Sequence, residues 1–230
     1  MNYQTWRPVY ELILDDFGFA RSADERARDA LADLARPFDL DRLDATGLTV
    51  AVAGAGPSLT DADQLDRARD ADAVFAASTA ADDLRDAGIA VDCMVTDLDK
   101  NPATARELTR DGIPVAAHAH GDNLAALREW VPRFDLDHVL ATTQARPVGP
   151  VRNFGGFTDG DRAAFLADHL SADRLVFVGW DLDDPDVDAT KAKKLRWAER
   201  LLRWLELRRG EEFDVLDGRR GEIDVSEFPG

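Results

Sequence analysis

The chain has little cysteine, no long apolar run and almost no lysine. Its only cysteine, Cys93, excludes an internal disulfide, and no Cys/His spacing suggests a zinc site. The longest apolar stretch, Leu48 to Gly56, is far shorter than the roughly 20 residues that span a bilayer. The N-terminus has no basic segment before an apolar core, so no secretory signal is expected. We therefore expect a cytoplasmic protein with no membrane partner.

Lysine contributes only four of the 28 basic residues, whereas aspartate contributes 35 of the 45 acidic residues. The resulting net charge of −17 argues against binding to the nucleic-acid backbone or to anionic lipid. Abundant Asp and Ala with so little Lys is typical of proteins adapted to high salt, because salt screens the self-repulsion of a carboxylate surface. The composition indicates a halophilic habitat and says nothing about the function.

The order of apolar and amphipathic segments predicts the fold class. Two helices open the chain, at Pro8–Phe17 and from a capping box of Ser22 and Glu25 to before Pro37. Six short apolar strands follow: Leu48–Ala53, Ala73–Ala77, Val91–Thr96, Ile113–Ala117, His138–Ala141 and Leu175–Gly179. The helical segments among and after them are Asp61–Asp70, Ala80–Ala87, Pro102–Arg110, Asn123–Trp130, Asp161–Leu170 and Ala189–Arg209.

Short strands that alternate with helices predict an α/β fold, a three-layer doubly wound arrangement with a mainly parallel sheet. Phe213–Leu216 is predicted as a final edge strand. We expect residues 1–45 to form an N-terminal helical segment packed on the core, and residues 46–230 to form the α/β domain. Ligands of such sheets bind beyond the carboxyl ends of the strands, so the residues that follow each strand are the candidate site.

The first strand ends in a glycine turn, Gly54-Ala-Gly-Pro-Ser58. The third glycine of a dinucleotide fingerprint would fall at Leu59, so that motif fails. The backbone amides of Gly54 and Gly56, with Pro57 and Ser58, can still cradle a phosphate or nucleotide. The alternative is an ordinary tight turn. Other candidate ligand contacts after strands are Ser78, Thr79 and Asp181.

Asp97 and Asp99 follow the third predicted strand. Aspartate is so common here that the pair alone carries little weight, but its position at a strand end favours a Mg²⁺ site that bridges substrate phosphates. The alternative is a solvated loop.

The segment His118-Ala-His-Gly-Asp-Asn123 holds two of the four histidines, and strand alternation puts both imidazoles on one side. His118 and His120, with Asp122, can bind phosphate or metal or move a proton. Asp122 or Asn123 can also cap the next helix.

Two later segments carry further candidates. Thr158 and Asp159, bracketed by glycines, suggest close approach to a ligand, although either residue can be only a helix cap. Three of the four lysines fall in Lys191-Ala-Lys-Lys194 at the start of the last helix, where they oppose the helix dipole. Phosphate binding explains such a cluster in a chain that otherwise avoids lysine, and the alternative is an exposed basic turn.

Taken in order, these motifs resemble the archaeal 6-hydroxymethyl-7,8-dihydropterin diphosphokinase family, from about Leu48 to Leu205. The motifs that carry the resemblance are Gly54–Leu59, Val95–Asp99, His118–Asn123, Gly156–Ala163, Gly179–Leu182 and Lys191–Leu195. The resemblance implies a Rossmann-like fold akin to the catalytic domain of thiamine diphosphokinases. That family has Gly-Asp-Phe-Asp-Ser where this chain has Thr96–Lys100, and an Asp-Gly-Gly turn where this chain has Ser78–Ala80. One usual metal carboxylate is thus absent here.

The resemblance also implies a reaction, in which the β,γ-diphosphate of ATP moves onto the hydroxymethyl group of the pterin and AMP is released. The product would serve folate or methanopterin biosynthesis. Asp97 and Asp99 would hold Mg²⁺, Lys191 and Lys194 would balance phosphate charge, and Asp122 or His120 would help to deprotonate the alcohol.

The pterin contacts and the assembly are less defined. Asn123, Thr158 and Asp159 are candidate pterin contacts, because a pterin edge needs groups that donate and accept hydrogen bonds. ATP and the pterin are the expected partners, and the sequence leaves open whether the protein forms a homodimer. Alternatives are a metal-dependent nucleotide-sugar glycosyltransferase, a thiamine-type diphosphokinase and a non-catalytic nucleotide-binding module.

Overall fold

The computed structural model describes residues 1–230 and contains one six-stranded sheet, with the strand order β5-β4-β3-β2-β1-β6. The strands are β1 (Thr49–Ala53), β2 (Ala73–Ala77), β3 (Cys93–Thr96), β4 (Val115–Ala119), β5 (Val139–Thr143) and β6 (Arg174–Val178). Every neighbouring pair is parallel. The predicted α/β fold is confirmed, and each strand begins within two residues of its predicted start.

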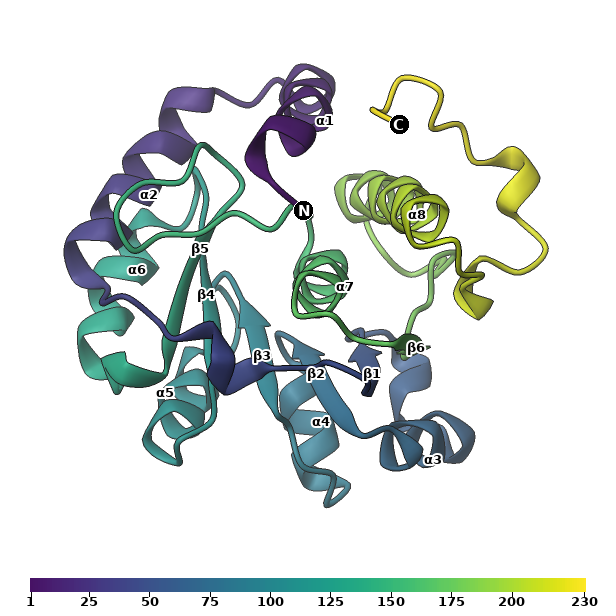
Figure 1. The fold of residues 1–230 in the computed structure, drawn as a ribbon, viewed down its shortest axis with the longest axis horizontal. Coiled ribbons are helices and arrows are strands. Elements are labelled where there is room, and N and C mark those ends of the chain that lie inside the picture. The colour runs from purple at the N-terminus through teal and green to yellow at the C-terminus, as the bar shows by residue number, and fades with distance from the viewer.

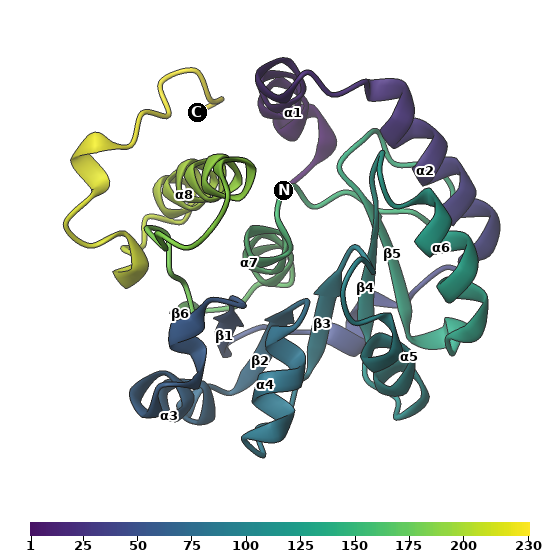
Figure 2. The same ribbon diagram turned by 180° about the vertical axis from the view of Figure 1, so that it is seen from behind.

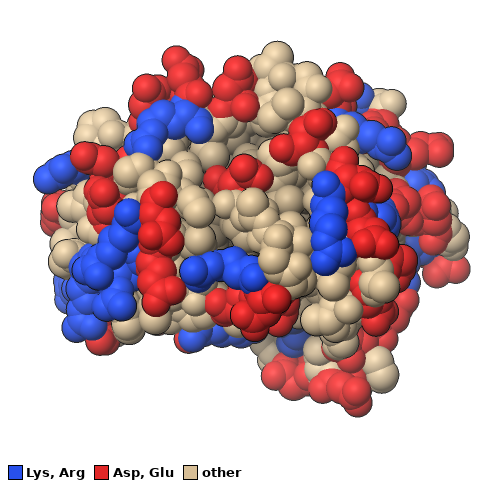
Figure 3. All heavy atoms as spheres, turned by 90° about the horizontal axis from the view of Figure 1, so that it is seen from below, with Lys and Arg blue, Asp and Glu red and all other residues tan.

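Helices cover both faces of the sheet (Figures 1 and 2). On one face lie α3 (Ala62–Asp70), α4 (Ala80–Asp86) and α5 (Pro102–Arg110), with α2 (Arg21–Leu34) and α6 (Leu124–Trp130) toward β5. On the other lie α1 (Tyr3–Phe17), α7 (Asp159–His169) and α8 (Ala189–Arg209). The side that carries α3, α4 and α5 displays acidic side chains with basic ones among them (Figure 3).

Strand alternation divides the core between the two faces. Val50, Val52 and Phe75 pack toward α7 and α8, whereas Ala51 and Ala53 pack toward the helices of the opposite face. All of these side chains are buried, which explains why the strands read as continuous apolar runs rather than alternating ones.

The winding of the chain determines where a ligand can bind. The strands β1 to β5 follow one another across the sheet, and the chain then crosses through α7 to the other face and returns beside β1 as β6. Because all strands are parallel, the segments that follow them emerge at one edge. The order in which strands are added reverses beside β1, where β6 joins the sheet, and the crevice at this point of the edge lies under α7 and α8.

The structure corrects several local predictions. The helix α1 begins at Tyr3, not Pro8, because the Asn2 side chain accepts a hydrogen bond from the Thr5 amide at 3.0 Å and caps it. The expected capping box of α2 does not form: its N-cap is Ala20, without a side-chain hydrogen bond. The expected edge strand is a 3-10 helix, Asp214–Leu216, whose apolar residues pack into the core instead of pairing with β6.

The N-terminal helices are part of the packed molecule. Trp6, Val9, Tyr10 and Ile13 of α1 are almost fully buried in the same core as α7 and α8. No helix has both the length and the apolar character needed to cross a membrane.

Candidate active site

A cavity of about 700 Å³ opens at the carboxyl edge of the sheet. It is lined from the segments after all six strands, which contribute Ala55, Ser78, Asp99, His120, Gln144 and Trp180 in strand order. The amino ends of α7 and α8 and the connection between α1 and α2 complete its wall. The rim that the sequence predicted is therefore one continuous cavity.

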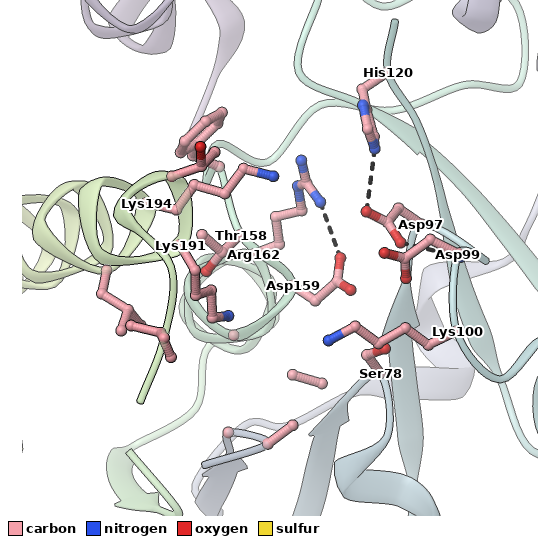
Figure 4. Close-up of a pocket in the computed structure, with 18 of the residues that line it drawn as sticks. Ser78, Asp97, Asp99, Lys100, His120, Thr158, Asp159, Arg162, Lys191 and Lys194 are labelled. Atoms are coloured by element: carbon pink, nitrogen blue, oxygen red, sulfur yellow. Dashed lines mark hydrogen bonds and ion pairs between the residues drawn. The ribbon is translucent and has the colours of Figure 1, made fainter. Parts of the chain in front are cut away.

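Asp97 and Asp99 line this cavity together because the residue between them has an unusual backbone. Leu98 has a left-handed conformation, with φ of 66°, which is rare for a bulky residue. The Thr96 hydroxyl accepts a hydrogen bond from the Leu98 amide at 3.0 Å, and Asp97 Oδ1 accepts one from the Asp99 amide at 3.3 Å. The turn holds both carboxylates at the same wall (Figure 4).

The two carboxyl groups differ in acidity. Burial acts to raise the pKa of Asp97, but hydrogen bonding to His120 and Asp99, and the charge of Arg162, hold it well below its usual range. Burial and the neighbouring Asp97 raise the pKa of Asp99 to about 6. Two acids forced together in this way form a favourable site for a divalent cation.

A hydrogen-bond network supports Asp97. His120 Nε2 lies 3.1 Å from Asp97 Oδ2. The Asn123 side-chain amide donates to the backbone oxygens of Asp97 and His118, at 2.7 and 2.6 Å, and its oxygen accepts from the His120 amide at 3.1 Å. Asn123 is the N-cap of α6 by position, but its side chain positions the site and does not cap the helix.

The two histidines differ in their surroundings. His120 and Asp122 line the cavity. The buried His118 lies behind it, with Nδ1 at 3.0 Å from the Thr142 hydroxyl, and its ring centre is 6.3 Å from that of His120. Burial and the charge of Arg162 keep the pKa of His118 well below its usual value, so the ring is neutral.

Three lysines extend into the cavity: Lys191 and Lys194 from α8, and Lys100 from the loop after β3 (Figure 4). Loss of solvent and repulsion from Lys100 and Lys194 lower the pKa of Lys191. Lys193 points elsewhere, as its spacing predicts, and its amine binds Asp16 Oδ1 at 2.9 Å. Three amines held together in an acidic protein form a site for an anion.

The amino end of α7 adds an ion pair to the cavity wall. Thr158 is the N-cap of α7, and its hydroxyl donates to Asp161 Oδ2 at 2.6 Å. One turn later Arg162 Nη1 donates to Asp159 Oδ1 at 2.9 Å, with both side chains largely buried. Burial and the charge of Asp97 outweigh Arg162 and raise the pKa of Asp159 to about 7.

The glycine turn after β1 is packed against the end of β6. The amides of Gly54 and Gly56 donate to the carbonyls of Val178 and Gly179, at 2.8 and 2.9 Å. A Cβ at Gly54 would lie 2.6 Å from the Gly179 oxygen, so close approach of the two loops requires glycine. Asp181 Oδ2 accepts from the amide and hydroxyl of Ser58 at 2.9 and 2.8 Å. These donors of the predicted phosphate cradle are therefore occupied within the protein.

Of the remaining predicted ligand contacts, some line the cavity and others do not. Ser78 lines it with a left-handed backbone, φ of 49°, and its buried hydroxyl has no partner within the protein. Strain and an unpaired polar atom at one residue are typical of a ligand contact. Asp181 also lines the cavity. Pro57, Ser58, Thr79, His118 and Asn123 do not.

Sequence reasoning missed several wall residues: Phe19, Asp24, Lys100, Gln144, Arg162 and Trp180. The scarcity of lysine that marked the α8 cluster applies equally to Lys100, so that signal was available. Nothing in the sequence marked Asp24, because α2 reaches the cavity only through tertiary packing. Gln144 lies in a segment that follows a predicted strand, so its place at the rim was predicted, but its role was not.

Comparison with known proteins shows the family to which this chain belongs. Residues 26–187 match the 6-hydroxymethylpterin diphosphokinase MptE-like family. The chain is 41% identical to a 6-hydroxymethyl-7,8-dihydropterin pyrophosphokinase of Methanothermobacter thermautotrophicus, over 90% of this chain and 96% of the relative. It is 38% identical to the same enzyme of Pyrococcus furiosus, over 89% and 94%, and 30% identical to that of Methanocaldococcus jannaschii, over 89% and 96%. The chain belongs to the MptE-like 6-hydroxymethylpterin diphosphokinase family.

Proposed function

We propose that this protein transfers diphosphate from ATP to the hydroxymethyl group of 6-hydroxymethyl-7,8-dihydropterin and releases AMP. The observation that carries this function is a pair of carboxylates, Asp97 and Asp99, in one cavity with three lysines. That combination suits a polyphosphate and its cation, and the family supplies the acceptor.

Asp97 and Asp99 would hold Mg²⁺, because hard carboxylate oxygens are its preferred protein ligands and Mg²⁺ usually completes its shell with water and phosphate. No third His, Cys, Asp or Glu joins them in a metal-binding group, so the protein contributes only part of such a shell. When bound, the ion would neutralise phosphate charge and align the β- and γ-phosphates.

The lysines would hold the rest of the phosphate charge, with the unpaired Ser78 hydroxyl as a further donor. The alcohol oxygen of the pterin attacks the β-phosphorus, and the bond from that phosphorus to the oxygen shared with the α-phosphate breaks. AMP leaves with that oxygen. Such chemistry depends on alignment and charge neutralisation more than on covalent catalysis.

The alcohol proton needs an acceptor, for which His120 and Asp122 are the candidates on the cavity wall. His120 is the better placed, since its contact with Asp97 fixes the ring. When Nε2 donates to Asp97, Nδ1 is free to accept a proton. Asp122 is exposed and has no side-chain contact that would orient it.

The test is an incubation with ATP, Mg²⁺ and 6-hydroxymethyl-7,8-dihydropterin in which AMP and ADP are quantified separately. We expect AMP formation that requires both the pterin and Mg²⁺. ADP as the product, or equal AMP without the pterin, would contradict the proposed function. A parallel incubation with thiamine as acceptor tests the thiamine-type alternative, for which we expect no AMP.

A further inference from the structure

A buried carboxylate of α2, that of Asp24, connects the N-terminal helices to two loops of the cavity wall. Its Oδ1 accepts a hydrogen bond from the Gly121 amide at 2.7 Å. Its Oδ2 accepts one from the Tyr10 hydroxyl at 2.7 Å and one from Gln144 Nε2 at 2.8 Å. Burial and the charge of Asp24 raise the pKa of Tyr10, so this hydroxyl keeps the proton that it donates. All three partners are donors, which is the arrangement that satisfies an ionised carboxylate in a buried position.

The first branch of this network reaches His120. Gly121 follows His120 directly, so the hydrogen bond from its amide to Asp24 fixes the backbone beside the imidazole. The loop approaches α2 so closely that a Cβ at Gly121 would lie 2.9 Å from the Ala23 Cβ, and this approach requires glycine. His120 is thereby held against Asp97, on the wall where the alcohol proton needs an acceptor (Figure 4).

The second branch reaches Arg162 through Gln144. The Gln144 side chain donates to Asp24 with its nitrogen and accepts from Arg162 Nη2 with its oxygen, at 3.2 Å. The Gln144 carbonyl accepts from the Trp6 indole N–H at 2.9 Å, which attaches the same segment to α1. Since Arg162 Nη1 donates to Asp159, the guanidinium is held from two sides.

We propose that Asp24 is a positioning residue of the active site, whose carboxylate fixes both His120 and Arg162. The inference rests on the diphosphokinase function proposed above. Both oxygens of Asp24 accept hydrogen bonds within the protein, so its effect passes through the two groups that it holds. None of these hydrogen bonds reaches a lysine of the cavity, so loss of the carboxylate should affect the catalytic step and not the binding of ATP.

The directions of the hydrogen bonds explain why a carboxylate is needed at this position. The path from the Gly121 amide to Arg162 begins and ends with an N–H donor. One carboxylate and one amide between these donors match every link. Two amides in series do not, because each way of turning them leaves two donors facing each other. Asp24→Asn therefore breaks the path, whereas Asp24→Asn combined with Gln144→Glu restores it at the same total charge.

The test is steady-state kinetics of pterin-dependent AMP formation by Asp24→Asn, Gln144→Glu and the double variant. Gln144→Glu alone sets two carboxylate oxygens against each other, so both single variants break the path. We expect each to lower kcat about 10- to 100-fold, as for a small misplacement of groups near the reacting atoms, with the KM for ATP unchanged. The double variant should recover most of the lost kcat. A double variant no faster than Asp24→Asn would overturn the assignment.

Glu206→Gln is the matched control for a loss of stability alone. Glu206 is a buried carboxylate of α8 outside the cavity, and its Oε1 accepts from the Phe213 amide and from Arg220 Nε, each at 2.7 Å. Its replacement by an amide should lower the melting temperature and leave kcat per folded enzyme unchanged. An equal loss of kcat in Glu206→Gln and Asp24→Asn would show that Asp24 only stabilises the fold, and would overturn the assignment.

A second pair of variants tests the His120 branch and does not depend on the folding of Asp24→Asn. Gly121→Ala should lower kcat, because the new methyl group pushes the loop away from α2, and adding Ala23→Gly should restore it by making room. If wild type forms pterin-dependent AMP and neither Asp24→Asn nor Gly121→Ala lowers kcat, this assignment is overturned while the diphosphokinase function stands. A loss of kcat that neither second substitution restores would also overturn it. Wild type without pterin-dependent AMP would instead refute the function itself.

Discussion

The backbone conformations of two individual residues determine how this site is shaped. Leu98 and Ser78 both have left-handed φ angles at strand ends, one between the paired carboxylates and the other with an unpaired hydroxyl in the cavity. The sequence places Asp97 and Asp99 at a strand end, but it does not reveal that both side chains share one wall. Leucine gives no signal for a left-handed conformation, because the cost is met by the surrounding fold.

The paired carboxylates give the most direct test at this scale. We expect Asp97→Asn or Asp99→Asn to lower turnover about 100-fold or more, because each loses a Mg²⁺ ligand and the charge stabilisation it supports. The melting temperature should change little. Asp61→Asn and Asp135→Asn are controls, since both residues are exposed members of similar Asp-x-Asp pairs. Equal losses at all four positions would mean that the effect belongs to the acidic surface.

Asp159 predicts a pH-dependent stability. Its carboxyl has a pKa of about 7 in the folded protein against an ordinary value of 3.8, so folding takes up a proton between these values. The stability that comes from this bound proton is present at low pH and is lost as the pH rises from 3.8 to about 7. The Asp159→Asn variant lacks this loss of stability at high pH. The melting temperature of the variant minus that of wild type should therefore be larger at about pH 8 than at about pH 5.

The measurement is a series of thermal melts across this pH range in EDTA without nucleotide. Asp173→Asn, on an exposed residue, should show a constant difference from wild type. If the melting temperature of Asp159→Asn also differs from that of wild type by the same amount at every pH, the charge of Arg162 outweighs the effect of burial on the pKa of Asp159. The Asp159 carboxyl would then be ionised across the whole pH range.

At the scale of elements, apolar patterning predicts the regular structure well and the contacts between elements poorly. The bounds of β2, α5 and α8 are as predicted, because their apolar spacing and end residues agree. The Phe213–Leu216 prediction is wrong, because an apolar run can be buried by a turn that packs on the core as well as by a strand. The role of α2 in the cavity was invisible, since Asp24 meets Gln144 across 120 residues of chain.

The first turns of α8 show how one element separates binding from structure. Lys191 and Lys194 lie three residues apart on one helix face and enter the cavity. Lys193 faces α1, where its amine donates to the Asp16 carbonyl at 2.6 Å. Trp197 reinforces this contact through its indole N–H, 2.7 Å from Asp16 Oδ2. The helix is thereby anchored by one set of side chains and free to present the other.

This division predicts different kinetics for three single variants. Lys191→Gln and Lys194→Gln should raise the KM for ATP or lower kcat about tenfold, as expected for a lost charge-assisted contact to phosphate. Lys193→Gln should leave both constants unchanged, and its exposed ion pair is worth about 1 kcal/mol or less in stability. Steady-state kinetics at high KCl provide the measurement. Three variants that all behave like wild type would exclude α8 from phosphate binding.

At the scale of the whole molecule, the site is a cationic spot in a strongly acidic protein. The net charge of −17 repels ATP at long range, and salt removes this repulsion as well as any long-range attraction. Phosphates must therefore be held by short-range contacts, which the three clustered lysines supply. The surface away from the cavity mixes exposed ion pairs, such as Arg69 with Asp66 and Arg85 with Glu107, with many unpaired carboxylates.

The balance between these surface charges predicts the salt dependence of folding. Unpaired carboxylates repel one another, and screening shortens from about 10 Å at 0.1 M salt to about 3 Å at 1 M. Salt also weakens the exposed ion pairs, but each contributes only about 0–1 kcal/mol, so the relief of repulsion dominates. We expect the melting temperature to rise on the order of 5 °C or more between 0.1 and 2 M KCl. Thermal melts in KCl and NaCl check this, and both salts should act alike if screening is the cause. A melting temperature that falls with salt would show that the ion pairs, and not the excess of carboxylates, govern the stability of the surface.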